Sequence, residues 1–474
     1  MKNLSISILN VDDIPTFLKQ LDSIQHSLNE SKVEDKFNIT IHFDVMDNKF
    51  VPNRGIDIEK IKIVREYGYY VDTHLMVEKP IEDGYIDRTI EYGCQDITIH
   101  YEIDDFDKNL NYLLKKKDEL NGELKIGVSL KPNTDISVLK KYVGKIDKIL
   151  IMSVEPGFGG QSYIESSTEK IGRVKTEYKN IFVQVDGGIN SQTLSKALNV
   201  DSLVVGSYLT KKIDELKDRI DILNIILNIE TTPKEANLEF EKRTIQAVEG
   251  GYAQGDILLG IRVPRLRKLA KLWYNIVSLN TLRFFISSKI HDYRRFAIFC
   301  LVNKVNSNNK NEIKEFIDEN LIYINNWDLV DSVAPICIGK QLINEDDEYI
   351  YNVLRDYTKS EDVWTKRIGI VSLLYIAKEN KKDVVFRVLD DVFYEEYHLF
   401  QKATGWVLRE LYKVNPNDTL MYLVDKNNNK KIPNILKSYA TEKMSSKEKS
   451  MLKWGEISYE KNCNYDSRWR LCRT

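Results

Sequence analysis

Hydrophobic and polar positions follow two different patterns in the two halves of this chain. Up to about residue 215, short apolar runs rich in β-branched residues alternate with longer amphipathic segments. Apolar strands separated by helix-length segments are typical of a parallel sheet. The runs predict eight strands: Leu4–Leu9, Ile39–Met46, Tyr70–Met76, Asp96–Tyr101, Lys125–Leu130, Lys148–Val154, Ile181–Asp186 and Ser202–Gly206.

The number of these runs predicts a closed barrel. Eight βα units within about 215 residues favour a (β/α)8 TIM barrel over an open doubly wound sheet. An open sheet would need a different strand count or a GxGxxG turn after the first strand, and the sequence has neither. A helical run over Glu215–Ile229 completes the pattern, so we expect an α/β domain over residues 1–229.

After residue 230 the pattern becomes helical. Glu230–Lys234 indicates a linker or a helix start. Beyond it, segments such as Asp292–Val305, Val363–Lys378 and Phe400–Lys413 carry apolar residues at i, i+3 and i+4, with short polar breaks between them. Repeated helices of this kind predict an all-α, HEAT-like α-solenoid over residues 230–458, with an irregular helical bundle as the alternative. Residues 459–474 form a polar tail that we expect to be frayed.

Composition narrows the class of protein. No apolar run approaches the ~18 residues that a membrane span needs, and the start of the chain lacks the pattern of a signal peptide. We therefore expect a cytoplasmic protein without a membrane partner. The five cysteines are odd in number and form no CxxC pair, which disfavours a disulfide framework or a thiolate zinc site.

Charge is distributed unevenly between the halves. Residues 1–230 carry 30 Lys and Arg against 38 Asp and Glu, a balance of −8, whereas residues 231–474 carry 39 against 33, a balance of +6. An acidic half is poorly suited to a polyanion, but a modestly basic half could hold one. The second half is therefore the candidate for a nucleic-acid partner.

Four polar residues fall at the carboxyl ends of predicted strands, where (β/α)8 active sites are built. His42 and Asp44 end the second strand, His74 the third and Asp186 the seventh. Each alone has an ordinary explanation, as a hydrogen-bonded buried histidine or a helix-capping aspartate. Together, two imidazoles and two carboxylates suit one divalent ion, such as Zn²⁺, Fe²⁺, Mn²⁺ or Co²⁺.

Glycines cluster after the last three predicted strands. They let backbone N–H groups approach an anion closely, and the loops after the last two strands commonly hold phosphate in this fold. The sequence therefore predicts a phosphate site built from Gly157, Gly159 and Gly160, from Gly187 and Gly188, and from Gly206 and Ser207.

Seven segments, in order along residues 4–210, carry a family resemblance. The first half of the chain resembles the ribulose-phosphate 3-epimerase family in Ser7–Leu9, His42–Asp47, Phe50–Asn53, Asp72–Val77, Leu130–Pro132, Met152–Gln161 and Val185–Asn190. It departs from the family at Asn10, where the family usually has Ser, and at Asn48, which replaces a glycine. Asn tolerates left-handed backbone angles better than most residues, so the turn at Asn48 is expected to survive.

The resemblance implies a metal-dependent epimerisation at C3 that converts D-ribulose 5-phosphate to D-xylulose 5-phosphate through an enediolate. It implies that His42, Asp44, His74 and Asp186 bind the metal, with Asp44 and Asp186 also acting as the acid/base pair on opposite faces of the carbon. The metal would polarise the C2 carbonyl. Ser7, Met46, Met76 and Met152 would contact the substrate. A ketohexose phosphate such as allulose 6-phosphate is the alternative substrate, and homo-oligomerisation through the barrel is left open.

The helical half carries a second resemblance, over about residues 236–455. Trp327 and Asp331 are spaced i, i+4, which places them on one helix face; from this spacing alone, a surface carboxylate is the simpler explanation of Asp331. The segments Gly255–Asp256, Leu259–Pro264, Asp292–Ala297, Asn326–Asp331, Lys366–Ile370 and Gln401–Glu410 resemble the helical-repeat DNA alkylation repair family, the AlkD-like DNA glycosylases.

This second resemblance implies excision of cationic alkylpurines, of the 3-methyladenine or 7-methylguanine type, from DNA. Trp327 and Trp406 would pack against the deoxyribose, and Asp331 would stabilise the oxocarbenium-like sugar, as carboxylates do in glycoside hydrolysis. Arg367 and Lys366 would hold backbone phosphates. The alternative is a helical scaffold that binds nucleic acid or protein without catalysis.

Overall fold

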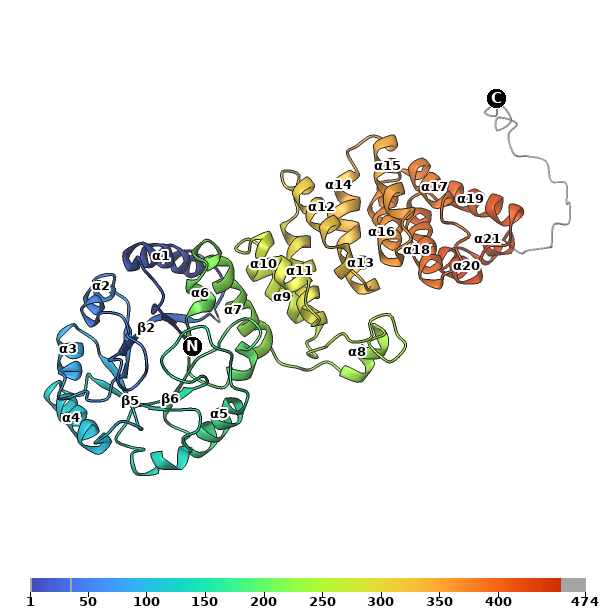
Figure 1. Ribbon diagram of the computed structural model, residues 1–474. Coiled ribbons are helices and arrows are strands. Elements are labelled where there is room, and N and C mark those ends of the chain that lie inside the picture. The colour runs from blue at the N-terminus through green and yellow to red at the C-terminus, as the bar shows by residue number, and fades with distance from the viewer. Residues whose placement is uncertain (1, 35, 453–474) are drawn as a thin grey trace, which may run out of the picture. The chain divides into compact units, whose positions relative to one another are not determined.

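The computed structural model describes residues 2–34 and 36–452 of the chain (Figure 1). The chain forms two compact units. Within the described residues, the first contains the chain up to Lys242 and Gly255–Asn303, and the second contains Arg243–Gln254 and Lys304–Leu452. The predicted domain boundary at residue 230 differs from this division and stays a prediction, and the predicted tail over 459–474 lies outside the described residues.

Eight parallel strands close into a barrel in chain order (Figure 1). This confirms the predicted TIM barrel, and each strand lies within two residues of its predicted ends. The strands are rich in β-branched and aliphatic residues and almost entirely buried, as strands covered on both faces require. Their bounds are β1 (Asn3–Ser7), β2 (Asn38–Met46), β3 (Val71–Met76), β4 (Asp96–His100), β5 (Lys125–Leu130), β6 (Lys148–Met152), β7 (Phe182–Asp186) and β8 (Ser202–Val205).

Helices surround the barrel, but the connections differ in regularity. The first begins at Ile14, where the Asp13 side chain accepts a hydrogen bond from Thr16 N at 3.1 Å. The connections after β5 and β7 contain 3₁₀ turns, and α5 lies between β6 and β7. The helices are α1 (Ile14–Glu30), α2 (Ile61–Glu66), α3 (Tyr85–Glu91), α4 (Phe106–Glu119), α5 (Ser166–Glu177), α6 (Ser207–Thr210) and α7 (Leu216–Thr231), with turns η1 (Ile58–Lys60), η2 (Ile136–Lys141), η3 (Leu194–Ala197) and η4 (Ile213–Glu215).

Helix α7 is buried over most of its surface because it packs on the barrel and also against helices that follow it. The Trp273 indole donates to Asn228 Oδ1 at 3.0 Å, and the Ser278 hydroxyl donates to Asp218 Oδ1 at 2.5 Å. The first unit therefore extends beyond the barrel to α9 (Val263–Trp273), α10 (Leu279–Ile286) and α11 (His291–Lys304).

The second unit is built from two rows of helices (Figure 1). In one row α18 packs between α16 and α20, and in the other α15 packs beside α17. This arrangement agrees with the predicted HEAT-like α-solenoid. The bounds are α12 (Lys310–Glu319), η5 (Leu321–Tyr323), α13 (Trp327–Val333), the π-helical turn η6 (Ala334–Gly339), α14 (Lys340–Leu342), α15 (Asp347–Thr358), α16 (Val363–Lys378), α17 (Lys382–Asp390), α18 (His398–Val414), α19 (Pro416–Asn429), α20 (Asn434–Ala440) and α21 (Ser446–Ser450). Helix α8 (Leu238–Thr244) begins in the first unit and ends in the second.

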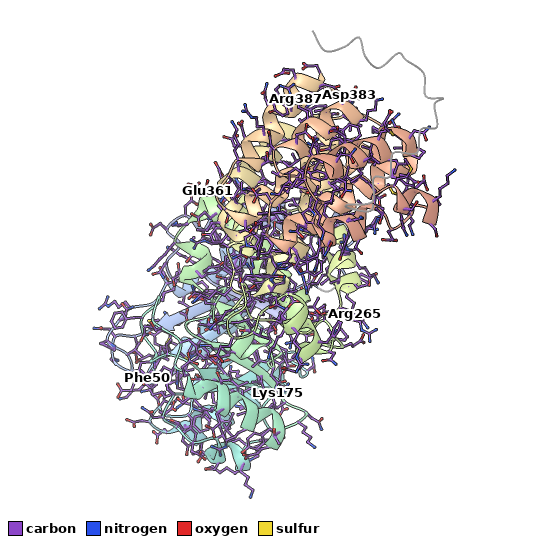
Figure 2. All side chains as sticks on the ribbon, turned by 90° about the vertical axis from the view of Figure 1, so that its right-hand side faces the viewer. Phe50, Lys175, Arg265, Glu361, Asp383 and Arg387 are labelled. Atoms are coloured by element: carbon purple, nitrogen blue, oxygen red, sulfur yellow. The ribbon has the colours of Figure 1, made fainter. Side chains whose placement is uncertain are left out.

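Two glycines lie where neighbouring helices of this unit approach each other closely. A Cβ at Gly369 would lie 2.7 Å from Thr358 Cγ2, and a Cβ at Gly405 would lie 2.6 Å from Tyr439 Cβ. Glycine is therefore required where α16 meets α15 and where α18 meets α20. On the other row, Arg387 of α17, labelled in Figure 2, pairs with Glu348 of α15.

Three of the five cysteines lie in the described part of the chain. Cys94, Cys300 and Cys337 are buried free thiols, and Cys463 and Cys472 lie outside the described residues. Across residues 2–34 and 36–452, every helix is too short or too polar to cross a membrane.

Candidate functional sites

The four predicted metal ligands meet at the carboxyl ends of β2, β3 and β7. Each of His42, Asp44, His74 and Asp186 offers one ligand atom, and these atoms all lie within 4.8 Å of one another. His42 Nε2 and His74 Nδ1 lie 3.3 and 3.4 Å from Asp44 Oδ1. The same two nitrogens lie 3.8 and 3.7 Å from Asp186 Oδ2. Strand register helps to bring them together, since Asp44 is paired with His74 across β2 and β3.

The polar atoms of this cluster fit a divalent cation. His42 Nε2, His74 Nδ1 and Asp44 Oδ1 are buried, and each lacks a hydrogen-bond partner among the described residues. Buried polar atoms are normally paired, so atoms without hydrogen-bond partners that converge on one point require another explanation. Two imidazole nitrogens and two carboxylate oxygens form a donor set that suits a metal such as Zn²⁺ or Fe²⁺. These residues therefore form a candidate metal site.

The two carboxyl groups of the cluster have pKa values that are shifted in opposite directions. Burial alone would raise the pKa of Asp44, but the His42 and His74 imidazoles hold it well below its usual range. Burial raises the pKa of Asp186 to about 7, with a further contribution from the charge of Asp44. Burial lowers the pKa of His74 to about 3. A pair of carboxyl groups with separated pKa values is suited to divide base and acid roles.

Asp72 supports the site and was missed from the sequence. Its carboxylate contacts His42 Nδ1 and accepts hydrogen bonds from Ser5 Oγ at 2.9 Å and Gln184 Nε2 at 2.5 Å. A metal-bound histidine commonly donates its other ring N–H to a carboxylate, which fixes its tautomer. Asp72 lies two residues before His74, on the same face of β3, and it is the first residue of the Asp72–Val77 segment that carries the family resemblance.

A cavity of about 400 Å³ opens beside the carboxyl groups. All the predicted substrate-contact residues line it, although His42 and His74 are buried away from it. The Ser7 hydroxyl donates to Asp44 Oδ2 at 2.7 Å, so Ser7 helps to orient that carboxylate. The predicted residues lining the cavity are Ser7, Asp44, Met46, Met76, Met152, Gly157, Gly159, Gly160, Asp186, Gly187, Gly188, Gly206 and Ser207.

The loops around this cavity need residues with left-handed backbone angles. Gly188 has φ +68°, and a Cβ there would lie 2.5 Å from Tyr163 N. A side chain at Gly188 would therefore displace the loop after β6. Asn48 has φ +59°, which confirms that the turn accommodates asparagine in place of the usual glycine.

A larger cavity, of about 990 Å³, lies at the opposite end of the barrel. Its lining includes Asn3, Asn38, Lys125, Lys148 and Phe182, which are first residues of strands. Catalytic residues of this fold lie at the carboxyl ends of the strands, so the smaller cavity is the candidate active site.

The second unit contains a separate cavity of about 760 Å³, which holds the glycosylase residues predicted from sequence. Trp327 and Asp331 reach it from α13, Arg367 from α16 and Trp406 from α18. Further aromatic side chains line it, namely Tyr252, Tyr397 and Tyr439. The sequence did not single out these tyrosines, because they come from segments with no distinguishing pattern.

The two predicted phosphate contacts have different environments. Arg367 is buried, and its Nε and Nη2 donate to the two carboxylate oxygens of Asp331 at 3.0 and 2.8 Å. Its Nη1 donates to Leu399 O at 2.6 Å. Lys366 does not line the cavity, and its ammonium pairs with Glu395 at 2.7 Å. Burial raises the pKa of Asp331, and the Arg367 guanidinium opposes that rise.

Comparisons with known proteins match the two halves of the chain to two different families, the same two that the sequence motifs resemble. Residues 18–210 match the model of the ribulose-phosphate 3 epimerase family, and residues 234–444 match that of the DNA alkylation repair enzyme family. The ribulose-phosphate 3-epimerase of Escherichia coli K12 is 36% identical over 194 residues, which cover 38% of this chain and 83% of that protein. That of Buchnera aphidicola is 39% identical over 176 residues, covering 35% and 74%.

One solved structure, a predicted DNA alkylation repair enzyme from Enterococcus faecalis, aligns with 46% of this chain and 100% of its own. It is 16% identical with a TM-score of 0.36.

Proposed function

The chain belongs to the ribulose-phosphate 3-epimerase family through residues 18–210, and from this premise we propose that its barrel interconverts D-ribulose 5-phosphate and D-xylulose 5-phosphate. The observation that carries the proposal is the convergence of His42, Asp44, His74 and Asp186 on one point beside a cavity. The curated relatives are named for this activity.

Inversion at C3 requires that a proton leaves one face of the carbon and that a proton returns to the other face. Asp44 and Asp186 both line the cavity and come from β2 and β7, which are not neighbours in the barrel. Asp44, with its lowered pKa, is the base in one direction, and Asp186, with a pKa of about 7, supplies the proton. In the reverse direction the two roles are exchanged.

The remaining residues prepare the substrate for this transfer. The backbone N–H groups of the glycine loops are suited to bind the phosphate, which would fix the position of C3 relative to the carboxyl groups. Met46, Met76 and Met152 contribute apolar side chains to the lining of the cavity. When bound to His42, Asp44, His74 and Asp186, a divalent ion would polarise the C2 carbonyl and stabilise the negative charge of the enediolate.

The test is a metal analysis combined with an epimerase assay of the purified full chain, with His42→Ala as the control variant. We expect near-stoichiometric metal in the native chain, turnover of D-ribulose 5-phosphate, and loss of both in the variant. A variant that loses the metal and keeps its turnover contradicts the proposed chemistry. Parallel assays with allulose 6-phosphate decide the substrate: we expect a kcat/KM for the pentose at least about tenfold higher.

For the second unit we propose excision of cationic alkylpurines from DNA. The observation that favours it is that Trp327, Asp331 and Trp406 line one cavity although they come from helices α13 and α18, about 75 residues apart. The match of residues 234–444 to the DNA alkylation repair family supports it. Loss of a cationic base leaves positive charge on the sugar, and the Asp331 carboxylate is the group that would stabilise that charge.

Release of 7-methylguanine from methylated duplex DNA tests this second proposal. Asp331→Asn should abolish release, whereas Asp328→Asn on the same helix α13 serves as the matched control and should retain it. If the native chain binds the DNA but releases no base, the non-catalytic scaffold is the correct description. The predicted phosphate contacts of Arg367 and Lys366 stay proposals, because both side chains already pair with carboxylates.

A further inference from the structure

The two ring nitrogens of His74 face different surroundings. Nδ1 faces the Asp44 and Asp186 carboxyl groups, whereas Nε2 lies 2.9 Å from Nε2 of His100. His100 ends β4, the strand that pairs with β3. The two imidazole rings are stacked, with centroids 4.9 Å apart. His100 therefore contacts a candidate metal ligand on the side away from the ligand atoms.

Metal binding through Nδ1 would determine where the protons lie in this pair. A neutral imidazole carries one N–H, so a His74 that binds through Nδ1 has its proton on Nε2. That proton is donated to His100 Nε2, which must then have a free lone pair. The proton of His100 consequently lies on Nδ1, where it is donated to Glu102 Oε2 at 3.0 Å.

Glu102 is held in place by the loop after β5. Its other oxygen, Oε1, accepts the backbone N–H of Lys131 at 2.8 Å and the hydroxyl of Thr134. The carboxylate is thus ordered independently of His100. The chain of contacts runs from this loop through Glu102 and His100 to His74.

Water has little access to this chain of contacts. His74 and His100 are both fully buried, and the ring of Phe50, which is labelled in Figure 2, lies 4.7 Å from that of His100. No solvent can replace a lost partner of His74 Nε2, so that N–H depends on His100. His42 differs, because its second nitrogen contacts the Asp72 carboxylate directly.

We propose that His100 and Glu102 are a positioning pair that sets the tautomer of His74 and thereby strengthens metal binding. The inference rests on the metal site of the proposed function and adds two residues to it. Neither His100 nor Glu102 lines the substrate cavity, so the pair acts on the metal ligand and not on the sugar. Partners of metal-bound histidines typically contribute about ten- to a hundredfold in metal affinity.

Two substitutions of His100 separate hydrogen bonding from packing. His100→Phe keeps an aromatic ring beside His74 but has no acceptor for its N–H, so we expect metal affinity about ten- to a hundredfold weaker. His100→Gln can accept from His74 with its amide oxygen and donate to Glu102 with its amide nitrogen, so it should restore most of the affinity. Glu102→Gln removes the charge and allows His100 to flip its tautomer, and it should give an intermediate loss.

The experiment is a titration of the metal-stripped full chain with Zn²⁺ against a competing chelator, with circular dichroism to verify folding. The absorption spectrum of the Co²⁺ complex should change in His100→Phe, since the orientation of one ligand is lost. At saturating metal the KM for the sugar phosphate should stay within about twofold of the native value.

The outcomes separate this inference from the proposed function. If a folded His100→Phe chain binds Zn²⁺ as tightly as the native chain, or if His100→Gln is as weak as His100→Phe, the positioning role is overturned. If the native chain itself binds no metal, the metal site of the proposed function is overturned together with it. Should His100→Phe fail to fold, the same comparison is made between Glu102→Gln and the native chain.

Discussion

Arg367 donates to both carboxylate oxygens of Asp331, at 3.0 and 2.8 Å, in a cavity of the second unit that Trp327 and Trp406 also line. Planar guanidinium groups suit such two-point contacts better than ammonium groups do. The Arg367 guanidinium opposes the rise in the pKa of Asp331 that burial causes, and the two hydrogen bonds fix the direction of the carboxylate. This two-point contact is expected if Arg367 orients the Asp331 carboxylate, the group that would stabilise the sugar.

Replacement of Arg367 by lysine tests that role. Arg367→Lys keeps one positive charge but loses the two-point contact, so we expect the single-turnover rate of 7-methylguanine release to fall about tenfold or more. Affinity for the alkylated duplex should change little. If instead affinity falls and the slope of log K against log salt decreases by about one, Arg367 binds a phosphate, as the sequence resemblance implied.

Replacement of Asp186 should separate proton removal from proton return at the barrel site. In Asp186→Asn we expect kcat to fall about 10²–10⁴-fold, because the carboxyl group on one face of C3 is lost. Asp44 remains, so one of the two epimers should exchange its C3 hydrogen with deuterium oxide without forming product. The measurement is mass spectrometry of recovered substrate, with metal content determined in parallel. Equal exchange of both epimers would contradict the assignment.

Metal removal should destabilise the first unit. Asp44 and Asp186 converge on one point with two imidazoles. A cation that binds only the folded state raises the free energy of unfolding by about 2.7 kcal/mol when its concentration is a hundredfold above its Kd. For a unit of about 290 residues that corresponds to a rise of roughly 4–5 °C in Tm. Thermal unfolding with and without chelator measures it. In His42→Ala the chelator should have little effect, and an equal shift in that variant would place the metal elsewhere.

Asp221 on α7 should make stability depend on pH. Burial raises the pKa of Asp221 to about 6, and Lys217, at 2.5 Å, only partly offsets this. In the unfolded chain the pKa is about 3.9. Between these values the folded chain keeps a proton that the unfolded chain has lost, so stability decreases as pH rises from about 4 to about 6. The free energy of unfolding falls by about 3 kcal/mol over this pH range.

Asp221→Asn removes this titration, and it should therefore be more stable than the native chain above pH 6 and should lose that advantage near pH 4. Melting curves of both chains across this range measure the difference. A constant difference between the two chains at every pH would contradict the raised pKa. Asp218→Asn, one turn away on the same helix, is unsuitable as a control because Asp218 accepts hydrogen bonds from Ser278 and Thr281.

The hydrophobic pattern was sufficient to predict the strands of the barrel and the change to helices near residue 230. The strand pattern and the helix pattern of apolar residues each extend over a few consecutive residues, so both can be recognised without knowledge of the fold. The four metal-ligand candidates could be predicted for a related reason. Parallel strands that close into a barrel bring all their carboxyl ends to one rim, and His42, Asp44, His74 and Asp186 each stand at such an end.

Other features depended on contacts between distant segments. The contact of Asp72 with His42 follows from the register of β2 and β3, which places the two residues opposite each other. His100 became informative because its ring stacks on His74, and Glu102 because the loop after β5 holds it. Likewise, the grouping of α9 and α10 with the barrel follows from their packing on α7. These contacts depend on strand register and side-chain direction between segments that lie tens of residues apart. The spacing of residues within one segment does not encode such relationships, so only the tertiary structure determines them.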